Sequence, residues 1–148
     1  MTEFNKDMLK LENQMCFPLY AASKEVIRRY KPFLDPLDLT YTQYITLMIL
    51  WEEQRMSVKA LGERLYLDSG TMTPVLKKLE AKHYIRRSRA THDERSVEIT
   101  LTEDGMALKE KAAHVPQYMQ ACVHLTPDER TQLQGLLAKL LRSLTDEE

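Results

Sequence analysis

The stretch from residue 57 to residue 102 changes its hydrophobic period partway along, and this change limits the possible folds more than any other feature. Two short segments with helical spacing, at about 57–66 and 71–82, flank the tight turn LDSG. After them the apolar period falls from about 3.6 to about 2 residues, in two runs near 85–89 and 96–101 around a charged tip. Two helices, a tight turn and a hairpin together predict a winged helix-turn-helix.

Four further helical segments surround this unit. The first runs from about residue 7 to 33, where we expect Pro18 to bend or offset the helix and Pro32 and Pro36 to end it. The second runs from residue 40 to 53, and we expect one buried face formed by Tyr44, Leu47, Met48 and Trp51. The fold class is therefore mainly α with a small β-hairpin wing and six helices.

Capping residues set the starts of the other helices. Ser57 can cap the helix that follows it, and Thr102 can cap a fifth helix from Glu103. Thr126, Pro127 and Glu129 form a capping box for a sixth helix that runs to about residue 144.

Composition is that of an ordinary globular protein. The 148 residues are 43% hydrophobic and 29% charged, with a net charge of -1, which predicts one domain with a core of its own. We expect a cytoplasmic protein without a membrane partner, because neither a leader nor a long apolar run is present. The two cysteines, Cys16 and Cys122, are expected to rest as thiols in that compartment.

Positive charge is concentrated on the predicted second helix and wing. Residues 77–95 hold seven Lys or Arg against three acids, which predicts contact with DNA phosphates. Small hydroxyl side chains can contact base edges and phosphates in the major groove, and the lysines can contact phosphates. Arg95 has the length and charge to enter a minor groove, and Asp93 is expected to orient the loop or Arg95. The predicted DNA-binding set is Ser69, Thr71, Thr73, Lys77, Lys78, Arg87, Asp93 and Arg95. A basic residue of the hairpin taken alone is usually ordinary solvated surface, and only the arrangement of these residues favours contact with DNA.

The segments LGERLYLDSGTMTPVLKKLE and DERSVEITLTEDG resemble the multiple antibiotic resistance regulator (MarR) family of winged-helix repressors. Asp93, Arg95, Leu101 and Thr102 match that family's wing motif. LENQMCFPLYAAS resembles the branch of the organic hydroperoxide resistance regulators (OhrR). The resemblance extends from about residue 11 to 144.

This resemblance implies a homodimer that reads a pseudo-palindromic double-stranded DNA operator. It divides a single MarR-like domain, residues 1–148, into dimerisation helices at 1–36 and 103–148 and a DNA-binding region at 40–102. The last helix carries an apolar stripe suited to a subunit interface, although an intrachain core is the alternative. The stripe consists of Leu133, Leu136, Leu137, Leu140, Leu141 and Leu144.

Cys16 lies in an apolar helical stretch, where a cysteine is usually an inert small hydrophobe. The resemblance instead makes it a redox sensor with Tyr20 and Tyr30, whose hydroxyls can donate to a thiolate. Within one straight helix Cys16 and Tyr30 are roughly 21 Å apart along the axis. Tyr30 is therefore expected to come from the second subunit.

The resemblance also implies that an organic hydroperoxide oxidises Cys16 to a sulfenic acid, which Cys122 of the other subunit captures as a disulfide, releasing DNA. Capture by a small thiol remains open. Three other readings stay open too: a repressor released by a noncovalent phenolic ligand, a thiol peroxidase, and a metal sensor built on Cys122, His124 and His114. We expect a regulator rather than an enzyme, with neither metal nor cofactor.

Overall fold

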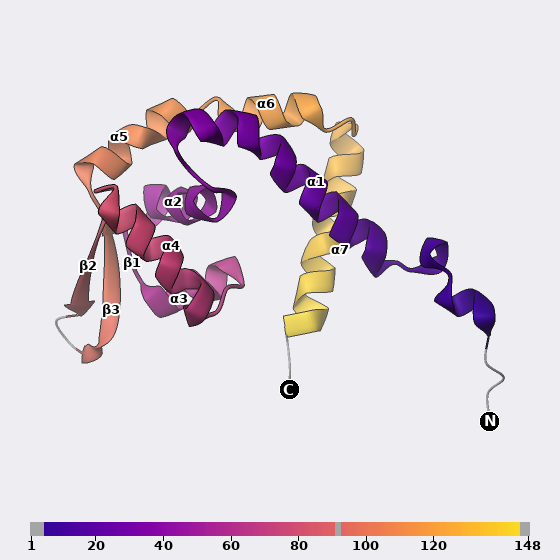
Figure 1. Ribbon diagram of the computed structural model, residues 1–148, viewed down its shortest axis with the longest axis horizontal. Helices are drawn as coiled ribbons and strands as arrows, with labels where there is room; N and C mark the ends of the chain where they lie inside the picture. The colour runs from indigo at the N-terminus through magenta and orange to yellow at the C-terminus, as the bar shows by residue number, and fades with distance from the viewer. Residues whose placement is uncertain (1–4, 91–92, 146–148) are drawn as a thin grey trace. The chain divides into compact units, whose positions relative to one another are not determined.

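The computed structural model describes residues 5–90 and 93–145, with side chains for all of these except 93–95. The chain forms two compact units, Met1–Pro116 and Gln117–Glu148. The first unit holds a helical cluster and a small sheet, coloured indigo to orange in Figure 1. Its elements are η1 (Lys6–Leu9), η2 (Leu11–Asn13), α1 (Cys16–Leu34), η3 (Asp35–Leu37), α2 (Tyr41–Glu53), β1 (Arg55–Ser57), α3 (Val58–Leu65), α4 (Ser69–Ala81), β2 (Ile85–Ala90), β3 (Asp93–Leu101) and α5 (Glu103–Ala112).

Helix α1 begins at Cys16, later than the sequence predicted. The residues before it form two short 3-10 turns, because side-chain amides donate hydrogen bonds to backbone carbonyls there. Asn13 Nδ2, for example, donates to the Asp7 carbonyl at 2.7 Å. Pro18 therefore lies in the first turn of α1, where a backbone N–H would have no partner within the helix. Its missing N–H removes no hydrogen bond, so there is no reason for the predicted bend at Pro18. The helix also continues through Pro32 to Leu34, so Pro32 does not end it.

The predicted caps of the winged helix are present. Ser57 Oγ accepts from the Ala60 amide at 3.1 Å, and Thr102 Oγ1 accepts from the Gly105 amide at 3.0 Å. Asp68 caps α4 in the same way, with Oδ1 accepting from the Thr71 amide at 2.7 Å. Helix α4 therefore begins at Ser69, two residues before the predicted start.

The predicted hairpin is the pair β2–β3, and a third strand joins it. The sheet is antiparallel in the order β1-β3-β2, with Met56 opposite Ile99 and Arg87 also opposite Ile99. Strand β1 was not predicted, because three residues are too few to show a period of two. The register shifts between Arg89 and Ala90 near the tip.

Helix α2 forms the centre of the core. Leu47 and Leu50 have no exposed surface, and Tyr44 is 3% exposed. Burial of each such leucine contributes about 1.5–3 kcal/mol. Met48 was expected on the same buried face but is 43% exposed, because the packed side of α2 is centred on residues 43, 46, 47 and 50. The other fully buried side chains include Leu61, Met72, Leu76, Leu79, Ile85 and Ile99.

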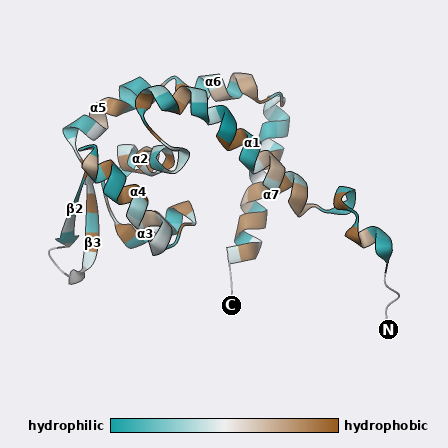
Figure 2. Ribbon diagram, in the orientation of Figure 1, coloured by the Kyte–Doolittle hydropathy of each residue, from teal (hydrophilic) through white to brown (hydrophobic). Residues whose placement is uncertain are grey.

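The second unit contains most of α6 (Val115–Cys122) and all of α7 (Pro127–Thr145). The predicted fifth helix is α5, whereas α6 was not predicted: Cys122 was expected to follow the fifth helix, and it is instead the last residue of an additional helix. The capping box of α7 is confirmed, since Thr126 N donates to Glu129 Oε1 at 2.9 Å and Glu129 N donates to Thr126 Oγ1 at 3.2 Å. Helix α7 has no buried residue along its length, and its ribbon in Figure 2 includes brown, hydrophobic segments.

No helix within residues 5–90 and 93–145 is long and apolar enough to cross a lipid bilayer.

Candidate DNA-reading surface and thiol site

Helix α4 has one buried face and one exposed face. Met72, Val75, Leu76 and Leu79 pack inward, while the predicted DNA-reading residues Ser69, Thr71, Thr73, Lys77 and Lys78 are all exposed. The Thr73 hydroxyl donates to the Ser69 carbonyl at 2.8 Å, so its oxygen remains as an acceptor. All five predicted residues of α4 are therefore accessible to a ligand.

Asp68 lies at the start of this surface. The Thr71 backbone amide, followed by the Thr71 side chain, holds the pKa of the Asp68 carboxyl below its usual range. The negative charge of the Asp68 carboxylate interacts favourably with the positive end of the α4 helix dipole, and the hydrogen bond that it accepts from the Thr71 amide defines where the helix begins. Sequence reasoning read this segment only as a tight turn, although an Asp three residues before a threonine amide is a recognisable cap signal.

The wing carries the rest of the predicted set. Arg87 lies in β2, but its guanidinium is paired with Glu80 of α4, with Nη2 2.9 Å from Oε1. Asp93 and Arg95 belong to β3, and their side chains lie outside the described residues. The expected role of Asp93, to orient the loop or Arg95, therefore stays a prediction.

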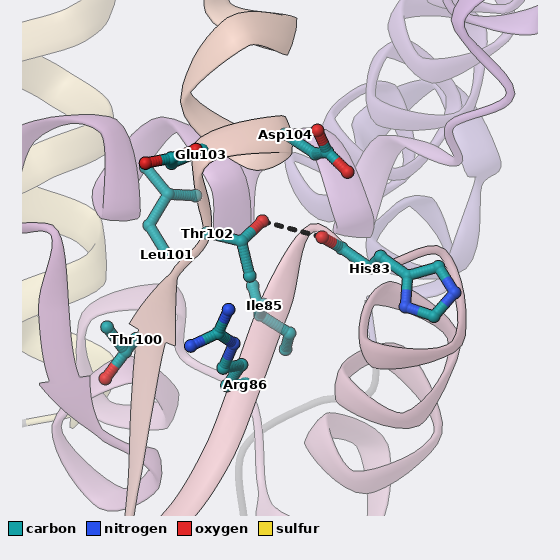
Figure 3. A pocket seen from close by; sticks show the side chains of 8 residues that line it. All are labelled: His83, Ile85, Arg86, Thr100, Leu101, Thr102, Glu103 and Asp104. Atoms are coloured by element: carbon teal, nitrogen blue, oxygen red, sulfur yellow. Dashed lines mark hydrogen bonds between the residues drawn. The ribbon is translucent and has the colours of Figure 1, made fainter.

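The root of the wing surrounds an open cavity, drawn in Figure 3. Its lining comprises His83, Ile85, Arg86, Thr100, Leu101, Thr102, Glu103 and Asp104. Thr102 joins the elements here, because its hydroxyl donates to the His83 carbonyl at 2.6 Å and accepts from the Gly105 amide. The wing strands and the start of α5 are thereby held to one another.

Cys16 is the first residue of α1, and its thiol is exposed and free. Tyr20 follows one turn later, is 60% exposed, and has the Lys24 ammonium 5.4 Å from its ring centre. Phe17 and Leu19 are also exposed beside it. The thiol therefore lies in the first turn of α1, on an apolar and aromatic surface that is exposed in the single chain.

Tyr30 lies near the other end of α1, inside an aromatic cluster of its own chain. Its ring centre is 4.9 Å from that of Tyr41 and 5.8 Å from that of Tyr44. Burial, followed by the neighbouring Tyr41, raises the pKa of the Tyr30 hydroxyl, which keeps it a protonated donor. The structure brings Tyr30 to Tyr41 and Tyr44, whereas Cys16 is about 21 Å away along the helix.

Sequence reasoning missed Tyr41 and Tyr44 as members of this cluster. The available signal was the spacing of two tyrosines in the first turn of the helix after α1. Burial also raises the pKa of Tyr41, and it raises that of Tyr44 to about 12. All three hydroxyls remain protonated at neutral pH.

Cys122 is the last residue of α6, a half-buried free thiol in the second unit. Among the described side chains, those of residues 5–90 and 96–145, no group of three His, Cys, Asp or Glu is arranged to hold a metal ion. The reading of Cys122, His124 and His114 as a metal sensor thus gains no support from the geometry.

Comparison with known proteins agrees with this fold. A family model described as transcriptional regulator SarA/Rot matches residues 28–112. The organic hydroperoxide resistance transcriptional regulator of Bacillus subtilis (strain 168) is 50% identical over 138 residues, which cover 93% of this chain and 94% of that protein. The HTH-type transcriptional regulator SarZ of Staphylococcus haemolyticus (strain JCSC1435) is 41% identical, with 92% of each chain covered.

Solved structures extend the likeness. The structure of reduced AbfR bound to DNA has a TM-score of 0.81 and 30% identity, covering 95% of this chain and 96% of that one. Disulfide-formed AbfR has a TM-score of 0.64 and 33% identity, covering 92% and 96%; AbfR is a protein of Staphylococcus epidermidis. The fold, the exposed helix α4 and these relatives define a DNA-binding transcriptional regulator of the winged-helix type, not an enzyme.

The chain belongs to the MarR family, in the branch of the organic hydroperoxide resistance regulators, as its motifs predicted. The reading of the chain as a thiol peroxidase is therefore wrong.

Proposed function

We propose that this chain is a homodimeric repressor that binds a pseudo-palindromic operator and releases it when an organic hydroperoxide oxidises Cys16. The observation that carries the proposal is the exposed thiol at the first turn of α1, beside apolar and tyrosine side chains. The 50% identity to a hydroperoxide resistance regulator supports the class of oxidant. A regulator whose ligand is DNA is expected to act in the cytoplasm.

Helix α4 enters the major groove in this proposal. Ser69, Thr71 and Thr73 contact base edges and phosphates near its start, and Lys77 and Lys78 contact phosphates one turn further on. Arg95 reaches a minor groove from the wing tip, oriented by Asp93. Arg87 was predicted in this set, and its contact with Glu80 gives it the different role argued below.

Cys16 reacts as a thiolate. The sulfur attacks one peroxide oxygen, the O–O bond breaks, and the other oxygen leaves as an alcohol after it takes up a proton. Cys16 is oxidised to a sulfenic acid and the hydroperoxide is reduced. Apolar neighbours such as Phe17 and Leu19 favour an organic substituent on the peroxide over hydrogen peroxide.

The sensor site is completed across the dimer axis. Tyr20 comes from the same helix, but Tyr30 of the same chain is about 21 Å away. Antiparallel packing of two α1 helices brings Tyr30 of one subunit toward Cys16 of the other. The exposed apolar side chains of α1 and α7 supply interface surface for this pairing, among them Val26, Ile27, Leu133, Leu136 and Leu144.

Cys122 of the other subunit then captures the oxidised sulfur. Its thiol attacks the sulfenic sulfur, an S–S bond forms, and water leaves with the oxygen. A disulfide requires Cα atoms within about 7 Å. Any reduced dimer that holds these Cα atoms farther apart must repack, which changes the spacing of the two DNA-reading helices and lowers affinity.

The test is a DNA gel shift with and without cumene hydroperoxide, alongside non-reducing gels. We expect wild-type protein to release DNA, Cys16→Ser to keep it, and both Cys16→Ser and Cys122→Ser to lose the crosslinked dimer. Release of Cys16→Ser as readily as wild type contradicts the redox proposal. Release of Cys122→Ser with a small thiol bound to Cys16 replaces only the disulfide step.

Mixed dimers test the cross-axis site. A dimer of one Cys16→Ser chain and one Tyr30→Phe chain keeps one complete site only if Tyr30 acts in trans. We therefore expect it to react with hydroperoxide faster than the Tyr30→Phe homodimer does, per remaining Cys16. Equal rates per thiol mean that Tyr30 does not serve the partner's Cys16.

A second candidate function has one observation in its favour. A cavity of about 500 Å³ lies beside the end of α1 and the start of α2, lined by Lys24, Ile27, Arg28, Lys31, Leu34, Asp35, Leu39, Thr40 and Tyr41. Its mixture of cations and apolar side chains suits a phenolic or carboxylate ligand that would release the repressor noncovalently. Release of Cys16→Ser by such a compound, without hydroperoxide, would establish this alternative.

A further inference from the structure

One carboxylate joins helix α4, the recognition helix of the proposed function, to the wing. Glu80 lies in the last turn of α4, and Arg87 lies in β2. Arg87 Nη2 and Nε donate to Glu80 Oε1 at 2.9 and 3.2 Å, and the Arg87 backbone amide donates to Oε2 at 3.2 Å. Both oxygens of the carboxylate are therefore used, one by the side chain and one by the strand itself.

The backbone contact distinguishes this pair from an ordinary surface ion pair. Strand β2 is at the edge of the sheet, because the strand order is β1-β3-β2. Amides on the outer side of an edge strand lack a partner strand. Glu80 supplies the acceptor for one of them, so it fixes the position of the strand on α4 and not only the direction of a flexible side chain.

The charges of the pair are also satisfied within the chain. Both side chains are partly exposed, with 32% and 38% of the side-chain surface exposed for Arg87 and Glu80. The Arg87 side chain holds the pKa of the Glu80 carboxyl below its usual range, so the carboxylate stays ionised at neutral pH. A guanidinium already neutralised by a carboxylate has less to gain from a phosphate.

We propose that Glu80 is a positioning residue that fixes the wing on the recognition helix, and that Arg87 is its anchor rather than a phosphate contact. The inference rests on the proposed DNA-binding mode. Helix α4 and the wing must reach two different grooves at once, so their relative angle determines whether both contacts form together. A contact between the end of α4 and the middle of β2 sets this angle before DNA arrives.

Electrostatics and positioning predict opposite results for Glu80→Gln. Removal of a negative charge near DNA should tighten binding if the charge only repels phosphate, and it should free Arg87 to bind phosphate. Loss of the anchor should weaken binding. We expect Glu80→Gln to weaken binding about fivefold, whereas Glu110→Gln, which removes an exposed carboxylate from α5, should not weaken it.

The slope of affinity against salt separates the two roles of a cation. The probe is a duplex of about 30 base pairs that wild-type protein selects from a random-sequence pool. Each lost phosphate contact lowers the slope of log affinity against log salt by about 0.9. We expect Lys77→Met to lower the slope, and Arg87→Met and Arg87→Lys to weaken binding about fivefold with the slope unchanged.

The double variant completes the test. Glu80→Gln with Arg87→Met should bind no more weakly than either single variant, because both remove the same contact. Thermal unfolding identifies any variant that fails to fold, and the retained charge of Arg87→Lys provides the second variant in that case. Tighter binding by Glu80→Gln, or a salt slope lowered by Arg87→Met as by Lys77→Met, would overturn the proposal.

Failure of the proposed function has a different signature. In that case the wild-type chain selects no duplex, or hydroperoxide leaves its binding unchanged. Hydrogen exchange at the Arg87 amide tests the anchor without DNA: it should be protected in wild type and exchange faster in Glu80→Gln. Equal exchange in the two proteins would contradict the contact itself.

Discussion

Gly105 is the position where one added methyl group should damage the base of the wing. Its carbonyl accepts from Trp51 Nε1 at 2.8 Å, and its amide donates to Thr102 Oγ1 at 3.0 Å. A Cβ at this position would lie 2.3 Å from the Tyr84 carbonyl oxygen and 2.6 Å from Leu101 Cδ1. The nearest obstacle is backbone, which cannot rotate away as a side chain can.

The expected size of the effect follows from this geometry. Ordinary Cβ contacts begin near 3.4 Å, so the Tyr84 carbonyl or the start of α5 must shift by roughly 1 Å. Overpacking of this kind costs about 1–3 kcal/mol, and a weakened Trp51 hydrogen bond adds about 1 kcal/mol. We expect Gly105→Ala to lower the free energy of unfolding by about 2–4 kcal/mol and Tm by about 5–12 °C.

Gly135→Ala is the matched control, because the same substitution there should have the opposite sign. A Cβ at Gly135 meets no atom within 4 Å. Gly135 lies within α7, about half a turn around the helix from the leucine stripe at 100° per residue. Alanine is the better helix former by about 1 kcal/mol, so Tm should rise by about 2–4 °C.

The assay is thermal unfolding followed by circular dichroism, with all proteins at one concentration because dimers unfold in a concentration-dependent way. A Tm for Gly105→Ala equal to that of wild type would refute the close approach of α5 to Tyr84. A fall for Gly135→Ala would show that this face of α7 is covered in the folded protein.

Two further predictions concern pH. Hydrogen bonds from Thr71, Arg87 and Thr126 lower the pKa values of Asp68, Glu80 and Glu129, respectively. These ionised carboxylates stabilise the folded protein above their unfolded pKa of about 4, and this stabilisation is lost as pH falls through the folded pKa values. Tm of Glu129→Gln should therefore depend less on pH between about pH 5 and pH 2 than that of wild type, and identical curves would contradict this. Burial raises the pKa values of Tyr30, Tyr41 and Tyr44, so their ionisation, followed by ultraviolet absorbance, should lie above the usual range for tyrosine, and Tyr44→Phe should remove the step at about pH 12. Their stabilisation is present below about pH 10 and is lost as pH rises through the folded values.

The sequence predicted those parts of the fold that depend on local chemistry. The box of Thr126 and Glu129 and the cap at Ser57 were correct, because each needs only residues three apart. The hairpin was correct because its period of two differs from that of its surroundings. The start of α1 was wrong, because the amides of Asn13 and Gln14 bond to carbonyls several residues earlier and stabilise 3-10 turns instead.

Contacts between elements were beyond the reach of the sequence. Nothing in the spacing of Glu80 and Arg87 shows that the end of a helix meets the outer edge of a strand. Arg87 therefore resembled any other wing cation until its partner was known. Tyr41 and Tyr44 were likewise visible as residues of a buried helix, but their packing on Tyr30 depends on how α1 folds back onto α2.

The aromatic cluster suggests which DNA-reading unit responds to each oxidised thiol. Tyr30 packs on Tyr44, Tyr44 meets Trp51 edge-on with ring centres 6.3 Å apart, and the Trp51 indole donates to Gly105 at the base of the wing. These contacts all lie within one chain. In the proposed dimer, Cys16 of one subunit lies beside Tyr30 of the other subunit. We therefore expect oxidation of that Cys16 to affect the winged helix of the subunit that supplies Tyr30, rather than the winged helix of the subunit that supplies Cys16. Tyr30 contacts the ring of Tyr44, which is only 3% exposed and is therefore tightly packed. We therefore expect displacement of Tyr30 to disturb its packing on Tyr44 and, through Tyr44, the contact of Trp51 with Gly105.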